Sequence, residues 1–246
     1  MLPSMRVIVF ASQKGGSGKT TLSGHLAVQA ELSGAGPIAL IDTDPQGSLS
    51  KWWNVRESES PYFIQSVFSN LFQDLDLARR EGFRYVFVDT PPAVTRAISE
   101  VVNFADIVII PTRPSPHDLR AVGPTVDIVE SKHKQLIFVV NDATPRARLT
   151  SEAAVALSQH GTVAPTIIHN RVEYAGSMID GRTVMETNPK GRSSKEVASL
   201  WEYIHERLHR METVHAGWLD ENGQSAVEAN TNGLGRKAPS FGRRLQ

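Results

Sequence analysis

The sequence predicts an α/β fold with a mostly parallel, twisted sheet that helices cover on both faces. Three observations lead to it. Short apolar runs of four or five residues recur along the chain, segments with helical spacing of apolar residues separate them, and several runs end in polar residues. Runs this short and continuous are typical of strands buried on both faces, and their alternation with helices indicates parallel pairing.

In the first half of the chain, apolar runs predict strands at residues 7–11, 38–41 and 85–88, with a shorter one at 62–64. Apolar residues at helical spacing predict helices over residues 20–32 and 67–80. Trp52 and Trp53 follow the second strand in a stretch with few other signals, and two interpretations stay open. They either cap the core or belong to a mobile loop.

In the second half, the same criteria predict strands at residues 107–110, 136–140 and 163–168. Helices are predicted at 97–105, at 118–129, and from Thr150 or Ser151, as a cap, to 159. An amphipathic helix from Ser193 or Ser194 to Met211 completes the pattern. We therefore expect one domain over residues 1–212. Residues 213–246 are rich in Gly, Asn, Ser, Ala and Arg without periodicity, which predicts a disordered tail.

Composition narrows the possible functions. The chain has 246 residues and 40 % apolar content, enough for a substantial core, and its formal net charge is zero. Any affinity for nucleic acid must then come from a local patch. The absence of cysteine excludes disulfides, thiolate zinc sites and cysteine-ligated iron–sulfur clusters. No apolar run has the length of a signal-peptide core or a membrane span, so a soluble, cytoplasmic protein is expected.

A glycine-rich segment, QKGGSGKTT (residues 13–21), joins the first strand to the first helix. Its glycines let the backbone approach an anion without a Cβ in the way, and the helix N-terminus offers free N–H groups. A lysine and a threonine in this position bind the β and γ phosphates and Mg²⁺, respectively. The segment is therefore interpreted as a P-loop rather than a turn that binds nothing. The predicted nucleotide-binding residues here are Gly15, Gly16, Ser17, Gly18, Lys19, Thr20 and Thr21.

This P-loop departs from the usual pattern. Gln13 stands where a glycine is usual, and a second lysine, Lys14, opens the loop.

Three aspartates follow strand ends, where open α/β sheets place their ligands. Asp42 and Asp44 follow the second strand, and their spacing allows both to point the same way. Alternatively, they form a turn before Pro45. Asp89 ends the run at 85–88, where a carboxylate can hold the hydration shell of Mg²⁺ opposite the P-loop.

Four segments together resemble the ParA family of chromosome and plasmid partition ATPases, within the wider ParA/MinD group. They are KGGSGKTT (14–21), DTDPQGS (42–48), VDTP (88–91) and PTRPSPHDL (111–119). The likeness spans about residues 5–211. The size of the chain, with no helix-turn-helix segment before the P-loop, resembles the short ParF-like or orphan ParA branch.

The resemblance implies ATP and Mg²⁺ as cofactors. It implies that Lys14 reaches the phosphates of the opposite subunit in an ATP-bound sandwich dimer and that Asp44 positions the attacking water. Lys19 contacts the phosphates of its own subunit. Thr20, Asp42 and Asp89 correspond to the residues around the hydrated metal. Asn141 and the segment 168–171 are plausible contacts to the base, and His169 is expected to be structural.

The resemblance further implies that the dimer binds DNA without sequence preference, at the nucleoid, until a ParB-like or other partner stimulates hydrolysis. Its cargo is DNA or a protein assembly. The alternative for the basic residues before and in the last helix is a solvated charged face. The candidate DNA contacts are Arg182, Lys190, Arg192, Lys195, Arg207 and Arg210.

A second function stays open, a MinD-like ATPase at a membrane surface. It requires a C-terminal amphipathic anchor with basic flanks. Residues 239–246 contain two arginines but only Phe241 and Leu245 as apolar anchors. No membrane anchor is therefore expected.

Overall fold

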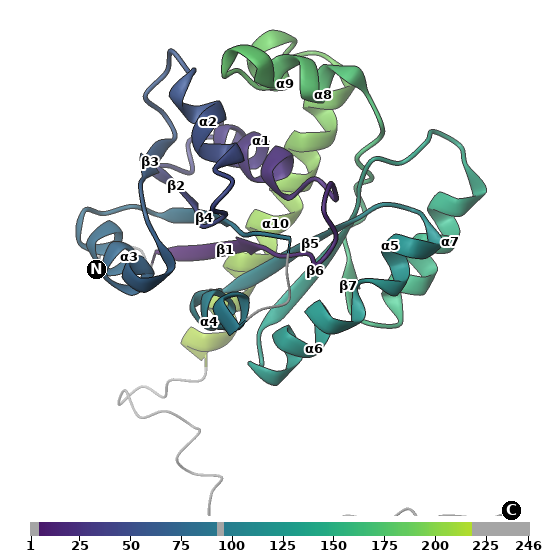
Figure 1. Ribbon diagram of the computed structural model, residues 1–246, viewed down its shortest axis with the longest axis horizontal. Helices are drawn as coiled ribbons and strands as arrows, with labels where there is room; N and C mark the ends of the chain where they lie inside the picture. Colours follow the sequence, from purple (N-terminus) through teal and green to yellow (C-terminus); the bar gives the residue numbers. More distant parts are fainter. Residues whose placement is uncertain (1–4, 93–95, 218–246) are drawn as a thin grey trace, which may run out of the picture. The chain divides into compact units, whose positions relative to one another are not determined.

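A seven-stranded parallel sheet forms the centre of the structure, a computed structural model that describes residues 5–92 and 96–217 (Figure 1). The strand order is β3-β2-β4-β1-β5-β6-β7, and every paired neighbour runs parallel. This confirms the predicted fold class. The strands are β1 Arg6–Phe10, β2 Ile38–Asp42, β3 Tyr62–Ile64, β4 Tyr85–Asp89, β5 Ile107–Thr112, β6 Gln135–Val140 and β7 Thr162–Val163.

Helices connect the strands. The α-helices are α1 Lys19–Leu32, α2 Ser48–Asn54, α3 Leu71–Arg80, α4 Arg96–Phe104, α5 Pro116–Arg120, α6 Gly123–Ser131, α7 Arg148–Ser158, α8 Val172–Ser177, α9 Val184–Thr187 and α10 Arg192–Gly217. Two short 3₁₀ helices are η1 Phe68–Asn70 and η2 Met178–Asp180. The chain divides into two compact units, residues 1–205 and 206–246, and the sheet belongs to the first.

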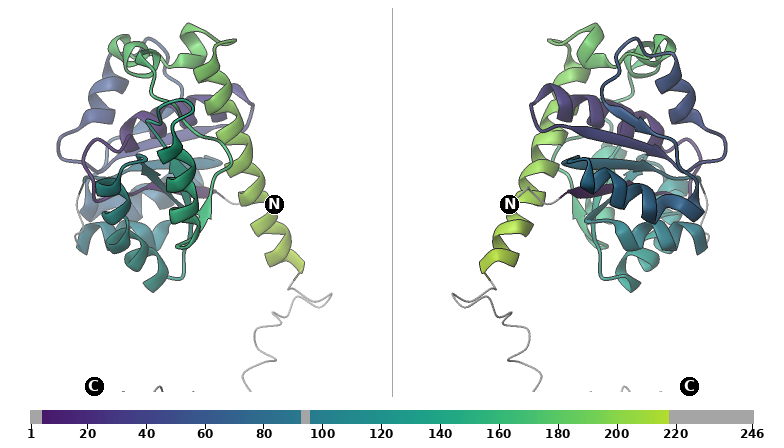
Figure 2. Two further views of the ribbon diagram at one scale, coloured as in Figure 1. Left: turned by 90° about the vertical axis from the view of Figure 1, so that its right-hand side faces the viewer. Right: turned by 90° about the vertical axis from the view of Figure 1, so that its left-hand side faces the viewer.

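Each face of the sheet buries alternate residues of its strands. On one face, Val9, Val88 and Val108 pack in a cluster with side chains of α3, α4 and α6. On the other face, Phe10 stacks on Phe87, whose ring also meets Trp201 in the first unit's part of α10. Figure 2 shows the helices of the two layers from either side. Helices on both faces explain why the strands are apolar throughout rather than alternating.

The structure corrects one predicted helix and one predicted strand in the second half of the chain. The helix predicted at 118–129 is two helices, because Pro124 has no N–H and its ring conflicts with the carbonyl of Arg120, where α5 ends. The strand predicted at 163–168 is only Thr162–Val163. Pro165 has no N–H to donate to β6, although Ile168 N still reaches the carbonyl of Val140 at 3.0 Å.

Other elements differ at their ends or were not predicted. Helix α7 begins at Arg148, so Thr150 and Ser151 lie inside it and do not cap it. Helix α10 continues past Met211 to Gly217, and the remainder of the expected tail, residues 218–246, lies outside the described residues. Three short helices, α2, α8 and α9, were not predicted.

The unpredicted helix α2 answers the question left open for the tryptophans. Trp52 is 5 % exposed, and a Cβ on Gly24 of α1 would lie 3.3 Å from its ring. Trp52 Nε1 also donates to the carbonyl of Arg182 at 3.2 Å. Trp53 stacks on Phe63 of the edge strand β3. Both tryptophans therefore fasten α2 to neighbouring elements rather than belonging to a mobile loop.

Candidate functional site

The glycine-rich segment forms a loop between the end of β1 and the start of α1. Gly16 and Gly18 have φ values of 70° and 97°, a region that favours glycine. A Cβ on Gly18 would lie 2.1 Å from Nδ2 of Asn141, which itself donates a 2.7 Å hydrogen bond to the carbonyl of Ser17. Gly18 precedes α1 without a side-chain cap, so the first amides of the helix stay available to an anion.

The two lysines of this loop have opposite environments. Lys19 is 6 % exposed, and its Nζ donates to the carbonyl of Ser12 at 3.3 Å. Burial lowers the pKa of Lys19, while the charges of Asp89 and Asp44 act in the other direction. Lys14 is exposed, and within the described residues only its backbone N–H has a partner, the hydroxyl of Ser12 at 3.3 Å. One lysine is therefore built into the loop and the other projects from it.

Two aspartates from neighbouring strands meet beside the loop. Asp42 and Asp89 are register partners at the ends of β2 and β4. The hydroxyl of Thr20, on α1, donates to Oδ2 of Asp89 at 2.5 Å. Burial raises the pKa of Asp89 to about 7, with a smaller contribution from the charge of Asp42, and burial also raises the pKa of Asp42. The sheet thus brings together the three residues predicted around the metal.

In the segment after β2, the two aspartates form a turn and also lie on the side of the P-loop, so the two interpretations are compatible. Asp42 accepts hydrogen bonds from the backbone N–H groups of Asp44 at 3.0 Å and Ser50 at 2.9 Å, the latter in the first turn of α2. Asp44 accepts from the N–H of Gln46 at 2.9 Å, as in an Asx turn. Its charge nevertheless acts on Lys19. The turn therefore holds Asp44 where its charge acts on Lys19.

The side-chain oxygen atoms of Thr20, Asp42 and Asp89 suit Mg²⁺. Among residues 5–92 and 96–217, no group of three or more His, Cys, Asp or Glu side chains could hold a metal ion on its own. Mg²⁺ commonly takes only one or two carboxylates and completes its shell with phosphate oxygens and water. The hydroxyl of Thr20 and the carboxylates of Asp42 and Asp89 match that donor set.

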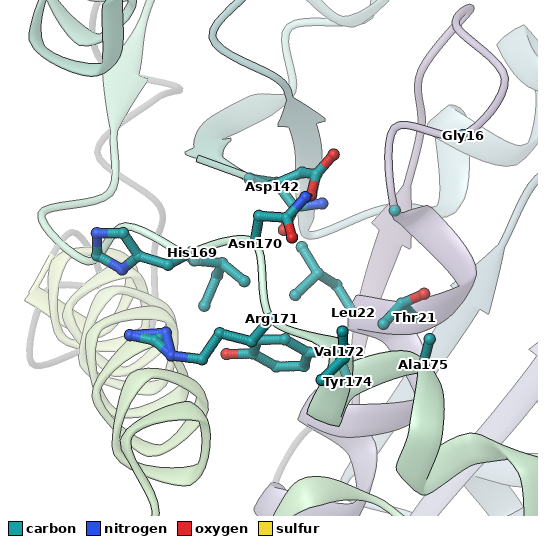
Figure 3. A pocket seen from close by; sticks show the side chains of 13 residues that line it. Gly16, Thr21, Leu22, Asp142, His169, Asn170, Arg171, Val172, Tyr174 and Ala175 are labelled. Carbon is teal, nitrogen blue, oxygen red and sulfur yellow. The ribbon is translucent and has the colours of Figure 1, made fainter. Parts of the chain in front are cut away.

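A pocket of about 320 Å³ opens beside the loop (Figure 3). Gly16, Gly18, Thr21 and Leu22 form its loop side, and Asn141 and Asp142 follow β6. The predicted base-contact segment, residues 168–171, lines the pocket together with Val172, Tyr174 and Ala175. Asn141 lines the pocket, and its amide braces the P-loop through Ser17. The size and lining of the pocket suit a nucleoside.

Sequence reasoning missed a charged group behind this pocket. Glu196, on α10, accepts hydrogen bonds from Arg171 Nη2 at 2.8 Å and from the hydroxyl of Tyr174 at 3.0 Å. His169 Nδ1 lies 2.8 Å from the same carboxylate, which fits its expected structural role. No local motif marks Glu196, because its partners come from a segment about twenty-five residues earlier.

The candidate DNA contacts differ in whether their charge is already paired. Lys190, Arg192 and Lys195 are exposed around the start of α10, and no side-chain partner is found for them within the described part of the chain. Arg182 is also exposed but makes an ion pair with Asp180, with Nη2 2.6 Å from Oδ2. The first three therefore present a free positive charge, while that of Arg182 is partly offset. Arg210 pairs with Glu206 inside the second unit.

The parallel sheet, the P-loop and the acids at strand ends define a P-loop nucleotide-binding protein. The family model "CobQ/CobB/MinD/ParA nucleotide binding domain" matches residues 8–184. The chain belongs to this family and is a ParA/MinD-like ATPase.

Individual relatives and solved structures are consistent with this family and this fold. "Maintenance of carboxysome distribution protein A" of Halothiobacillus neapolitanus is 31 % identical over 199 residues, which cover 77 % of this chain and 91 % of the relative. The ATP complex of a Cyanothece McdA variant has a TM-score of 0.69 at 18 % identity, with coverage of 84 % of this chain and 97 % of that one. MinD from Aquifex aeolicus has a TM-score of 0.68 at 16 % identity, with coverage of 82 % and 97 %. At these identities the structural matches show the fold.

Among residues 5–92 and 96–217, no helix is both long and apolar enough to cross a bilayer.

Proposed function

We propose that this protein is an ATP-driven positioning switch. It binds ATP with Mg²⁺, pairs with a second copy as a nucleotide sandwich, binds DNA without sequence preference, and leaves the DNA when a partner stimulates hydrolysis. The observation that carries this proposal is the contrast between buried Lys19 and exposed Lys14 in a single loop.

The contrast supports different roles for the two lysines. Lys19 lies against a carbonyl of its own loop, beside the uncapped start of α1, so it serves the phosphates bound by its own chain. Lys14 projects from the same loop with a free ammonium group. A lysine in this place reaches the phosphates of a second chain once two P-loop faces meet. Hydrolysis then depends on dimerisation, and ATP acts as a timer.

The acids supply the remaining parts of phosphoryl transfer. Thr20, Asp42 and Asp89 would hold Mg²⁺, which neutralises the charge between the β and γ phosphates. Asp44, held by its turn near Lys19, orients the attacking water. Little covalent chemistry is asked of the protein, because positioning and charge neutralisation supply most of the catalysis.

The proposed DNA face consists of Lys190, Arg192 and Lys195. The protein would be cytoplasmic and would bind DNA at the nucleoid. Contacts to phosphate require no base-reading residues, and a dimer doubles the patch. The relative named for carboxysome distribution supports a protein assembly as the cargo. The stimulating partner, ParB-like or of another kind, would then connect the dimer to that assembly.

Light scattering with and without ATP and Mg²⁺ tests the switch. The Asp44→Ala variant should hydrolyse slowly and accumulate as a dimer of twice the 27.0 kDa chain mass. Adding Lys14→Ala to it should leave a monomer that still binds ATP. Lys134→Ala, at the opposite end of β6 from the site, is the matched lysine control and should leave the dimer intact. A dimer that forms equally well without Lys14 would exclude the proposed trans contact.

Pelleting assays test the surface that the ATP-bound protein binds. We expect it to bind plasmid DNA and not vesicles of anionic phospholipid. Binding to vesicles but not to DNA would replace the proposal with the MinD-like alternative.

A further inference from the structure

The wall of the nucleotide pocket is fastened to α10 through one carboxylate. Glu196 Oε1 lies 2.8 Å from both Nη2 of Arg171 and Nδ1 of His169. Its Oε2 accepts from the backbone N–H of His169 at 3.2 Å and from the hydroxyl of Tyr174 at 3.0 Å. The Glu196 side chain is 14 % exposed. Four groups of a single pocket wall thus converge on it, and hydrogen bonds to a charged acceptor are the stronger kind.

The segment that carries these groups has two faces, because side chains alternate along an extended chain. Asn170 points away from α10 and donates to Oδ1 of Asp142 at 2.6 Å. His169 and Arg171, on either side of it, point toward α10 (Figure 3). If a bound nucleotide moves Asn170, it therefore also moves the neighbouring His169 and Arg171, whose side chains bind Glu196.

A second connection joins the same elements. Ser193, in the first turn of α10, donates to Oε2 of Glu173 at 2.5 Å, and its carbonyl accepts from the hydroxyl of Tyr174 at 3.2 Å. Nη1 of Arg171, in contrast, is buried and has no hydrogen-bond partner among the described residues. A buried donor without a partner costs free energy, so another arrangement of the wall can gain by engaging it.

Residues that bind the pocket wall, here called the anchors, alternate with exposed cations at the start of α10. Ser193 and Glu196 face the pocket wall, while Arg192 and Lys195, their immediate neighbours in sequence, face solvent. Because these residues share one or two turns of a helix, a shift of the anchors moves the cations with them.

We propose that Glu196 is a positioning residue that couples occupancy of the nucleotide pocket to the placement of Arg192 and Lys195. The inference rests on the proposed function, since it takes the pocket to hold ATP and the cations to meet DNA. Coupling of two sites is reciprocal: ATP raises the affinity for DNA by the same factor by which DNA raises the affinity for ATP.

Glu196→Gln is the central variant. Its amide keeps the shape of the side chain but removes the charge and places N–H groups against donors. Hydrogen–deuterium exchange of residues 192–200 is measured with and without ATP and Mg²⁺. In the wild-type protein we expect ATP to slow exchange in this segment, and in Glu196→Gln we expect at least half of that effect to be lost. Glu202→Gln, an exposed glutamate of the same helix, should behave as the wild type.

Tyr174→Phe is a milder second variant. It removes the hydroxyl that reaches Glu196 and the carbonyl of Ser193 and leaves the ring that packs against His25, so it should fold even if Glu196→Gln does not. We expect a partial loss of the ATP effect on exchange. Full ATP-dependent protection of residues 192–200 in both variants would overturn the role assigned to Glu196.

The coupling factor gives a readout that general destabilisation does not produce. The ratio of DNA affinities with and without ATP should fall at least threefold in Glu196→Gln, and the reciprocal effect of DNA on ATP affinity should fall equally. Equal weakening of DNA binding with and without ATP, at an unchanged ratio, would contradict the inference.

Failure of the proposed function leads to different results. If the wild-type protein binds no ATP, both proposals fall. If ATP protects residues 192–200 through Glu196 but no DNA binds, only the DNA part of the proposed function is lost and the positioning role of Glu196 is supported.

Discussion

The hydroxyl of Thr20 lies 2.5 Å from Oδ2 of Asp89, 69 residues away in the sequence. The contact joins the first turn of α1, beside the P-loop, to the end of β4. It is possible because β4 is the immediate neighbour of β1 in the sheet, with Phe10 opposite Asp89. Both groups are oxygen donors of the kind that Mg²⁺ prefers.

Replacing Thr20 by valine tests this relationship. Valine keeps the shape but leaves the buried Asp89 without its hydroxyl donor, so the free energy of unfolding without nucleotide should fall by about 1–3 kcal/mol. The variant should also lose most of the gain in ATP affinity that Mg²⁺ gives. Titrations with ATP in the presence of Mg²⁺ and of EDTA measure that gain. Thr21→Val, one residue on, should retain it, and equal losses in both variants would contradict a specific role for Thr20.

Gly18 provides a test of the loop itself. Alanine there would be strained at φ 97°, and its Cβ would meet the amide of Asn141 at 2.1 Å. The free energy of unfolding should fall by more than about 2 kcal/mol, and ATP affinity should fall at least tenfold as the brace on Ser17 is displaced. Gly15→Ala is the control: no atom lies within 4 Å of its Cβ, so stability should be unchanged or slightly higher. Urea unfolding distinguishes the two variants, and ATP titration measures the loss of affinity in the Gly18 variant.

The site residues that could be predicted are those whose signals are local. The P-loop lies between a strand and a helix, and Asp42 and Asp89 each end an apolar run, so a parallel sheet necessarily brings them to one edge. The same reasoning predicted the sheet and most of the helices.

Long-range partnerships had no such signal. Arg56 makes two hydrogen bonds to Glu186 across 130 residues, at 3.0 and 2.6 Å, and both residues occur in stretches that look like polar loops. Helix α8 was missed for a related reason. It is six residues long and starts with a valine that is 86 % exposed, so it has no apolar stripe to detect.

Charge reversal at the start of α10 tests the DNA face. Arg192→Glu combined with Lys195→Glu should lower DNA affinity at least tenfold at low salt, and the slope of log K against log salt should fall by roughly 1 to 2. Arg182→Glu is the matched control, because its charge is already offset by Asp180, and it should have the smaller effect. Fluorescence anisotropy with labelled duplex DNA at several salt concentrations measures both quantities. An unchanged slope in the double variant would place the DNA face elsewhere.

His25 makes stability depend on pH. It is wholly buried on α1, its Nδ1 lies 2.8 Å from the carbonyl of Thr21, and its ring meets that of Tyr174 edge-on. Burial lowers its pKa from 6.5 to about 4, against smaller opposing effects of the Thr21 carbonyl and Glu186. In the unfolded chain His25 takes up a proton near pH 6.5, whereas the folded protein does so only near pH 4. The contribution of His25 to stability is therefore lost as the pH falls through this window, by about 2 kcal/mol at pH 5. The raised pKa of buried Asp89 acts in the opposite direction over the same pH range.

Urea unfolding of the nucleotide-free wild type and of a His25 variant at pH 7.5 and pH 5 isolates this contribution, because Asp89 titrates in both proteins. His25→Gln removes the titrating ring, so on going from pH 7.5 to pH 5 the change in its stability should be about 2 kcal/mol more favourable than the change in the wild type. His160→Gln removes an exposed histidine and should keep the wild-type dependence on pH. The variant at position 25 is expected to be less stable at pH 7.5, because the ring fills space in the core, so the comparison rests on the change between the two pH values. If the stabilities of the wild type and of His25→Gln change in parallel between the two pH values, buried His25 does not contribute as predicted.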